Sequence, residues 1–147
     1  MSVSGSDVSI RNCDIHDCWW GVSIQGGVSD GDAIVEYCEI HDISGAGIYV
    51  SGSTNENVKI RWNAIYDNSG NGIYTYDSPT DINHNTIAGN GGHGVDIRYS
   101  SGNIIKNCIL ALNTSYGISC TSATPAVSYN DAWSNTAGDY DGCTGGT

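Results

Sequence analysis

Short stretches of alternating apolar and polar residues recur along this chain of 147 residues. The clearest follow a glycine: GVSI from Gly21, GIYV from Gly47, GIYT from Gly72, GVDI from Gly94 and GISC from Gly117. A period of two places every second side chain on the same face of a β-strand. The apolar residues are therefore predicted to point into a core. The residues between them are predicted to point outward: Ser23, Tyr49, Tyr74, Asp96 and Ser119.

A second motif, an aliphatic strand followed by a turn residue and x-Ile, precedes each of these stretches. It reads VSIRNCDIHD from Val8, AIVEYCEIHD from Ala33, VKIRWNAIYD from Val58, TDINHNTIAG from Thr80 and GNIIKNCILA from Gly102. Two motifs that share a period of about 22–26 residues indicate a structural repeat, and units this short bury their apolar faces by stacking. We expect an aliphatic ladder through Ile15, Ile40, Ile65, Ile87 and Ile109, spaced by 25, 25, 22 and 22 residues. We also expect a turn ladder through Cys13, Cys38, Asn63, Asn85 and Asn107.

The repeat over residues 8–120 resembles the parallel β-helix repeat family, which includes pectate lyases, polygalacturonases, alginate epimerases and many secreted bacterial proteins. The resemblance implies an all-β fold: a right-handed parallel β-helix of about five coils, forming a single domain over residues 1–147 with repeats over about 8–126. Residues 127–147 depart from the period and resemble the C-terminal cap of such proteins. With this cap we expect a disulfide between Cys120 and Cys143, and we expect Cys13 and Cys38 to be buried thiols.

The composition bears on the kind of ligand. Phenylalanine is absent, whereas nine tyrosines and four tryptophans are present, so every large aromatic side chain carries a polar group. Either an aliphatic core needs no phenylalanine, or the aromatic residues form a surface. The net charge of −11 lacks the basic patch that nucleic acid requires and disfavours anionic membranes and polyuronates. We therefore expect neither nucleic acid nor membrane as a partner.

The cysteines and the N-terminus bear on the compartment. The six cysteines include no CxxC pair, which disfavours a zinc site or a thioredoxin motif. An even number of cysteines in a small acidic chain favours an oxidising, extracellular setting. The first residues lack the pattern of a signal peptide. We expect a domain of a longer secreted protein, with a catalytic domain as its neighbour.

The outward side of the GxxI strands is the first candidate site. Aromatic rings can pack on sugar rings while a few polar groups bind the hydroxyls. The candidate carbohydrate-binding residues are Trp19, Trp20, Gln25, Tyr49, Tyr74, Tyr76, Asp96, Arg98 and Tyr99. The alternative is cross-strand aromatic pairing that only stabilises the sheet.

The recurring IHD and IYD sequences form the second candidate. His16, His41 and Tyr66 are expected to stack outward, each followed by an aspartate. His16, His41, Asp17 and Asp42 could hold a metal, although aspartates at turns usually form only a solvated stripe. We expect no cofactor, a structural cation such as calcium being the alternative.

Catalytic groups are sparse on the tyrosine-rich strands. The resemblance implies a basic residue and a cation for a lyase, and a glycosidase needs two carboxylates on one face. Only Arg98 and Asp96 fall there, so we expect no catalytic residues. The favoured function is a non-catalytic carbohydrate-binding domain of a secreted polysaccharide-degrading enzyme, specific for a neutral plant polysaccharide such as xylan. The alternatives are a minimal polysaccharide lyase or hydrolase, and a structural or adhesin segment without a ligand.

Overall fold

The computed structural model describes residues 2–3, 7–26, 32–52 and 57–143, which form strands and turns only. No helix in these ranges is long and apolar enough to cross a membrane. The strands form three parallel sheets. Sheet A contains β1 (Ser2–Val3), β4 (Val22–Gln25), β7 (Ile48–Ser51), β10 (Ile73–Tyr76), β13 (Val95–Arg98), β16 (Tyr116–Thr121) and β19 (Gly138–Asp141).

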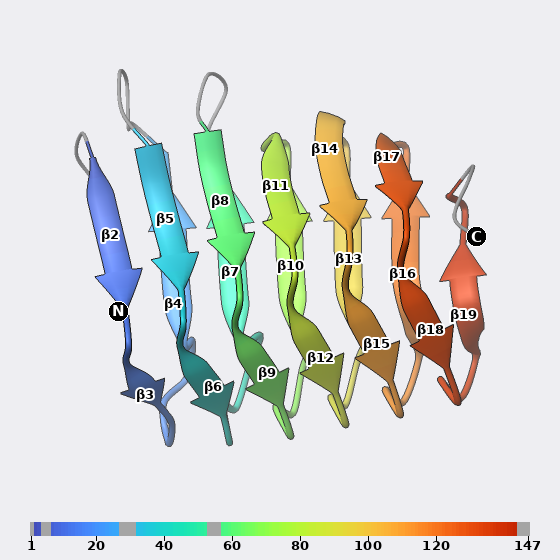
Figure 1. The fold of residues 1–147 in the computed structure, drawn as a ribbon, viewed down its shortest axis with the longest axis horizontal. Coiled ribbons are helices and arrows are strands. Elements are labelled where there is room, and N and C mark those ends of the chain that lie inside the picture. Colours follow the sequence, from blue (N-terminus) through green and yellow to red (C-terminus); the bar gives the residue numbers. More distant parts are fainter. Residues whose placement is uncertain (1, 4–6, 27–31, 53–56, 144–147) are drawn as a thin grey trace.

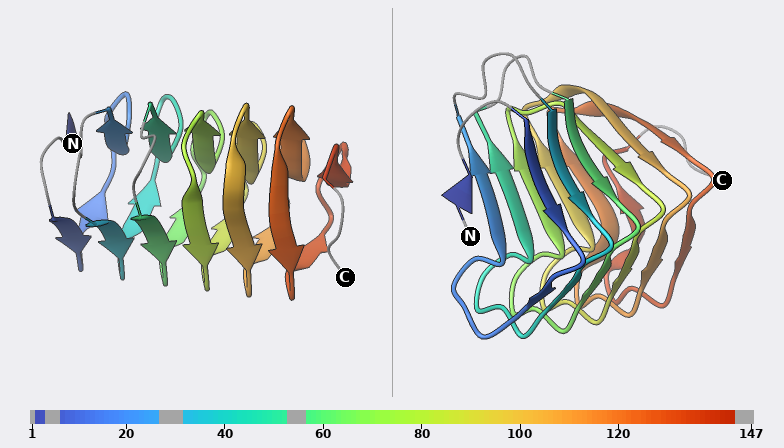
Figure 2. Two further views of the ribbon diagram at one scale, coloured as in Figure 1. Left: turned by 90° about the horizontal axis from the view of Figure 1, so that it is seen from above. Right: turned by 60° about the vertical axis from the view of Figure 1, so that its left-hand side comes forward.

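The other two sheets have six strands each. Sheet B contains β2 (Val8–Arg11), β5 (Asp32–Glu36), β8 (Asn57–Arg61), β11 (Thr80–Asn83), β14 (Ser101–Lys106) and β17 (Thr124–Ser128). Sheet C contains β3 (Asp14–Ile15), β6 (Glu39–His41), β9 (Ala64–Tyr66), β12 (Thr86–Ala88), β15 (Ile109–Ala111) and β18 (Asp131–Trp133). Figure 1 shows these strands side by side along the long axis, and Figure 2 shows the coils superposed with a three-sided outline.

Each full coil takes one strand from sheet B, one from sheet C and one from sheet A. Six such sets of strands run from β2–β3–β4 to β17–β18–β19, and they confirm the predicted all-β solenoid of about five turns. Residues 127–143 lie at the end of the stack, and their strands do not depart from the period. Ala132 pairs with Leu110 and Asp141 with Ser119, so this segment adds a rung in register with the coil before it.

The core is an aliphatic ladder, correctly predicted except in the fifth coil. Ile15, Ile40, Ile65 and Ile87 are in register, but the next member is Leu110, which is fully buried. Ile109 is instead 44% exposed. The fifth coil has six residue steps from Arg98 to Ile104, where the preceding coil has five from Tyr76 to Asp81. The extra residue moves every later position by one.

The same one-residue shift changes the predicted turn ladder. Asn107 faces outward with a positive φ of 54°, and Cys108 takes the buried position between Asn85 and Asn130. A second buried ladder, which sequence reasoning missed, runs between sheets C and A through Asn68, Asn90, Asn113 and Asn135.

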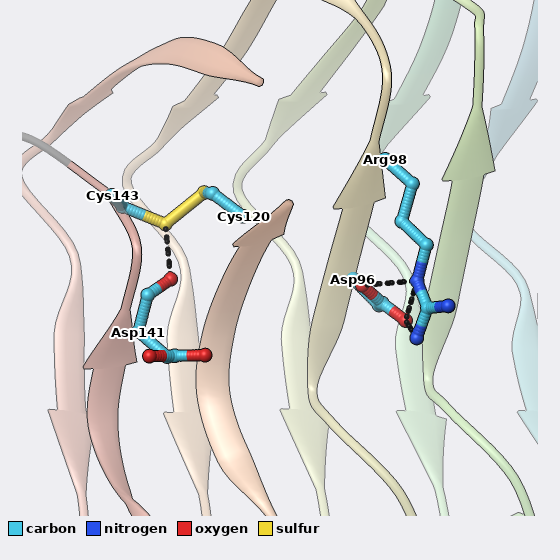
Figure 3. The surroundings of a disulfide bond; sticks show 5 residues. All are labelled: Asp96, Arg98, Cys120, Asp141 and Cys143. Carbon is cyan, nitrogen blue, oxygen red and sulfur yellow. Dashed lines mark hydrogen bonds and ion pairs between the residues drawn. A yellow bond between two sulfur atoms is a disulfide. The ribbon is translucent and has the colours of Figure 1, made fainter. Parts of the chain in front are cut away.

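The cysteine predictions are confirmed in two of three respects. A disulfide joins Cys120 of β16 to Cys143, beyond β19 (Figure 3). Cys38 is a buried free thiol, whereas Cys13 is free but exposed, contrary to expectation. Cys13 lies in the first coil, where β2 and β3 are edge strands, so no preceding coil in these two sheets covers it.

Candidate functional site

Two rows of outward side chains cross the strands of sheet A, as the sequence predicts. The first row contains Ser23, Tyr49, Tyr74, Asp96 and Ser119, in direct register from β4 to β16. The second row contains Gln25, Ser51, Tyr76, Arg98 and Thr121. Sheet A therefore carries most of the predicted carbohydrate-binding residues on its outward side.

Aromatic rings follow one another along this side of the molecule. Trp20 contacts Tyr49 with ring centroids 5.0 Å apart and planes inclined by 32°, and Tyr49 contacts Tyr74 at 5.5 Å and 35°. Tyr76 and Tyr99 form an edge-on pair at 5.5 Å and 66°. We call the six predicted rings the aromatic face: Trp19, Trp20, Tyr49, Tyr74, Tyr76 and Tyr99. Burial raises the pKa of Tyr74, whereas Trp19, Trp20, Tyr76 and Tyr99 are exposed.

Asp96 lies beneath the aromatic face rather than on it, with only 1% of its surface exposed. Its carboxylate accepts hydrogen bonds from Arg98 Nε at 3.1 Å and from Asn71 Nδ2 at 3.2 Å, and forms an ion pair with Arg98 Nη2 at 3.0 Å (Figure 3). The hydrogen bond to Asp96 raises the pKa of Arg98. The guanidinium carbon also lies 5.5 Å from the centroid of the Tyr74 ring. A ligand would therefore meet Arg98 and the rings before it met Asp96.

The predicted stack of His16, His41 and Tyr66 forms on the outward side of sheet C. His16 and His41 lie 5.3 Å apart at 14°, and His41 and Tyr66 lie 4.9 Å apart at 9°. Asp17 and Asp42 pair with Nδ1 of the preceding histidine, at 2.7 and 2.8 Å. The two aspartates have positive φ angles because they occupy the turn after each strand.

Donor atoms gather around His41 in a set that differs from the predicted one. His41 Nε2 lies 3.0 Å from Asp14 Oδ1, and the ligand atoms of Asp14, Glu39 and His41 lie within 4.8 Å of one another. The hydrogen bond to Asp42 raises the pKa of His41, and Asp14 raises it further. Sequence reasoning missed Asp14 and Glu39, although the repeat places both at the same position, one residue before the ladder isoleucine.

A model of the family described as the right handed beta helix region matches residues 1–146. The chain belongs to the right-handed β-helix family. Membership fixes the right-handed coiling and confirms the predicted fold class. Searches of curated proteins and of solved structures found no match. Because one fold supports many functions, membership in the β-helix family does not select a ligand.

The β-helix carries another ring stack at the corner between sheets B and C. Tyr37, Trp62 and His84 occupy successive coils with positive φ angles, and we call them the corner stack. Tyr37 and Trp62 lie 5.2 Å apart at 2°, and Trp62 and His84 lie 5.7 Å apart at 26°. Trp62 lies on the surface, with Arg61 over its ring.

Most basic residues of this β-helix are held by carboxylates. Arg11 and Arg61 both pair with the buried Glu36, at 3.0 and 2.7 Å. Lys59 pairs with Asp32 at 2.7 Å. Together with Arg98, four of the five basic residues are therefore ion-paired, and the surplus of acidic groups dominates the surface potential.

Proposed function

We propose that this β-helix is a non-catalytic carbohydrate-binding domain of a secreted polysaccharide-degrading enzyme, and that its aromatic face binds a neutral plant polysaccharide such as xylan. The observation that carries the proposal is the run of inclined rings along the outward side of sheet A. Successive parallel strands lie about 4.8 Å apart. The rings therefore recur at a spacing comparable to the length of one sugar residue.

The inclination of the rings supports binding. A ring that stacks flat on its neighbour covers its own face, whereas inclined rings leave part of each face for another partner. Tyr99 is 54% exposed, and a shallow hollow beside it is lined by Asp77, Pro79, Ser100 and Ser101. These residues offer hydroxyl and carboxylate groups to sugar hydroxyls at one end of the face.

The polar groups on this side suit a neutral ligand. Arg98 is partly exposed, but its charge is already balanced by Asp96, so its free N–H groups are better matched to hydroxyls than to a polyuronate. The Gln25 amide, anchored to Ser23 Oγ at 2.8 Å, is another exposed group. Binding should therefore depend little on salt.

The absence of catalysis is part of the proposal. A general acid or base must reach the scissile bond, and the carboxylate in the middle of this side is buried and ion-paired. The disulfide between Cys120 and Cys143 is compatible with an extracellular protein, which supports secretion.

Affinity electrophoresis in gels that contain xylan, mixed-linkage glucan, mannan or pectin tests the proposal. We expect retardation by a neutral polymer, and we expect Tyr76→Ala and Tyr99→Ala each to weaken retention about fivefold to tenfold through the loss of one ring contact. Tyr37→Ala is the matched control, because Tyr37 is equally exposed but belongs to the corner stack. It should leave retention unchanged.

Other results would support the alternatives. Free migration in every gel would contradict binding and favour a structural or adhesin segment. Release of reducing sugars or unsaturated products would favour a minimal polysaccharide-cleaving enzyme. Equal losses from Tyr37→Ala and Tyr99→Ala would show that the aromatic face is not the site.

A further inference from the structure

Two carboxylates and an imidazole converge on the outward side of sheet C, a sheet that takes no part in the proposed carbohydrate site. Asp14 of β3 and Glu39 of β6 are direct register partners in neighbouring parallel strands. Like charges in such positions repel each other. The lysine and arginine residues whose ion pairs are described above bind other carboxylates, so this pair depends on His41 and on a 3.4 Å contact from the Tyr66 hydroxyl to Glu39.

His41 is held in the orientation that a metal ligand requires. Its ring lies between those of His16 and Tyr66, which fixes the ring plane. Asp42 Oδ2 lies 2.8 Å from Nδ1, which leaves Nε2 directed toward Asp14 and Glu39. A carboxylate on the far nitrogen is the usual outer-shell partner of a metal-bound histidine, since it sets the tautomer and raises the basicity of the ligating nitrogen.

Open space adjoins two of the three residues. A hollow lined by Asn12, Cys13, Asp14, Tyr37 and Glu39 lies against the two carboxylates. It provides room for water or another exchangeable ligand. A site with three protein ligands and one open position is a common arrangement for zinc.

We propose that Asp14, Glu39 and His41 bind a divalent first-row transition cation, for which Zn²⁺ is the probe. Calcium prefers six to eight oxygen ligands, whereas an imidazole with two carboxylates suits zinc. Bonds of about 2.0–2.1 Å in a tetrahedral site separate the ligand atoms by about 3.3 Å. The observed separations, 3.0 Å for Nε2 to Asp14 Oδ1 and up to 4.8 Å within the set, need only small side-chain movements.

Zn²⁺ titration against a chromophoric chelator tests this site on the whole chain. Cys13→Ser and Cys18→Ser form the background, because these are the free thiols that are not buried. We expect one Zn²⁺ per chain, and we expect His41→Gln to weaken binding by more than about tenfold and Asp42→Asn by about tenfold. Asp17→Asn is the matched control, since Asp17 makes the same contact to His16 one coil earlier, outside the ligand set. It should change the affinity less than about twofold, where loss of an outer-shell partner costs about tenfold or more.

Cobalt substitution identifies the donor atoms. With Co²⁺ bound we expect visible d–d bands of the intensity typical of tetrahedral nitrogen and oxygen coordination, and no thiolate charge-transfer band in the near ultraviolet, both before and after the cysteine replacements. Equal losses from Asp17→Asn and Asp42→Asn, a thiolate band in the unsubstituted chain, or displacement by equimolar Ca²⁺ would overturn the assignment. Unchanged binding by both His41→Gln and Asp42→Asn would also overturn it. Circular dichroism checks that each variant is folded. If His41→Gln does not fold, the result with Asp42→Asn decides the outcome.

Discussion

Two corners of the solenoid have the same backbone plan but carry different side chains. The corner between sheets C and A repeats asparagine in four successive coils, at Asn68, Asn90, Asn113 and Asn135. We call this the continuous ladder. The corner between sheets B and C mixes cysteine and asparagine, and we call it the interrupted ladder; it contains Cys13, Cys38, Asn63, Asn85, Cys108 and Asn130.

The hydrogen bonds show the consequence of this difference. In the continuous ladder, Nδ2 of Asn68, Asn90 and Asn113 donates to Oδ1 of the next asparagine, at 2.9 Å each time. In the interrupted ladder, Asn63 Nδ2 donates to Asn85 Oδ1 at 3.0 Å, but the next member is Cys108. A thiol is a weak donor and offers no amide, so the chain of strong bonds ends there.

Each ladder supports a different surface. The continuous ladder lies next to the glycines that precede the strands of sheet A. A Cβ added at one of them, Gly94, would lie 2.6 Å from the Gly117 carbonyl oxygen and 2.9 Å from Asn113 Nδ2. Because side chains at these glycines would collide with the next coil, the strands that carry the aromatic face are closely fixed. The interrupted ladder lies under the corner stack, whose rings cover one another. We infer that the more completely bonded corner supports the proposed binding surface.

The largest expected effect is the loss of a member of the continuous ladder. Asn90→Ala removes the partner of Asn68 N, Asn68 Nδ2, the Ile65 carbonyl and Asn113 Oδ1. We expect the free energy of unfolding to fall by about 3 kcal/mol, since buried groups lose their partners. Asn85→Ala also removes four hydrogen bonds, but one of them is a local, part-buried bond to the Asn83 carbonyl, so this replacement should cost about 2 kcal/mol. Urea denaturation followed by circular dichroism measures both.

The control for this comparison is Asn107→Ala. Asn107 was predicted to be a ladder member, but it lies on the surface and donates only to Asn83 Oδ1 at 3.1 Å. Alanine is strained at the positive φ of 54° that asparagine accepts there, so the replacement should cost about 1 kcal/mol, still less than Asn85→Ala. A cost as large as that of Asn85→Ala would contradict the register described above.

Asn107 also shows how far sequence alone could predict this fold. The two motifs predicted the sheets, the inward residues and the outward rows. Stacked coils require only a constant repeat length and the alternation of inward and outward residues along each strand. In KNCILA, however, an asparagine precedes a cysteine and an isoleucine precedes a leucine, so either residue of each pair suits the position. The extra residue before Ile104 decides between them, and it lies in a turn with no apolar pattern. The continuous ladder left a signal, asparagines spaced by 22, 23 and 22 residues, but these turns carry no apolar pattern that would mark them.

The candidate site was less predictable for a similar reason. The alternation of residues along β13 placed Asp96 and Arg98 on the outward side of sheet A. It could not show that the Arg98 side chain folds back to cover Asp96. Nor could it show that His41 turns toward Asp14 of the preceding coil rather than toward His16 alone. Both outcomes depend on side-chain rotamers, which the spacing of residues in the sequence does not determine.

The next effect is a pH dependence of stability that only a ladder with a buried thiol should show. Burial raises the pKa of Cys108 to about 11, from an ordinary 9.0. Its protonated form therefore stabilises the fold below about pH 9, and this contribution of roughly 2–3 kcal/mol is lost as pH rises from about 9 to 11. In Cys108→Ser, urea midpoints should fall less steeply over this range. All other groups are common to both proteins, so their contributions cancel. Parallel pH profiles would contradict a buried neutral thiol at this position.

The smallest effect completes the interrupted ladder. In Cys108→Asn, the new Oδ1 would accept from the Asn85 amides as Asn85 Oδ1 accepts from Asn63, and the new Nδ2 would replace the long contact of 3.8 Å from Cys108 Sγ to the Ile82 carbonyl. Asn130 already accepts from the backbone N–H of residue 108 at 2.9 Å and would also accept from this Nδ2. A gain of about 0.5–1 kcal/mol in unfolding free energy is expected, the net value of a neutral hydrogen bond. A loss of stability would show that the cysteine is selected for its packing, and that the two corners differ in shape as well as in bonding.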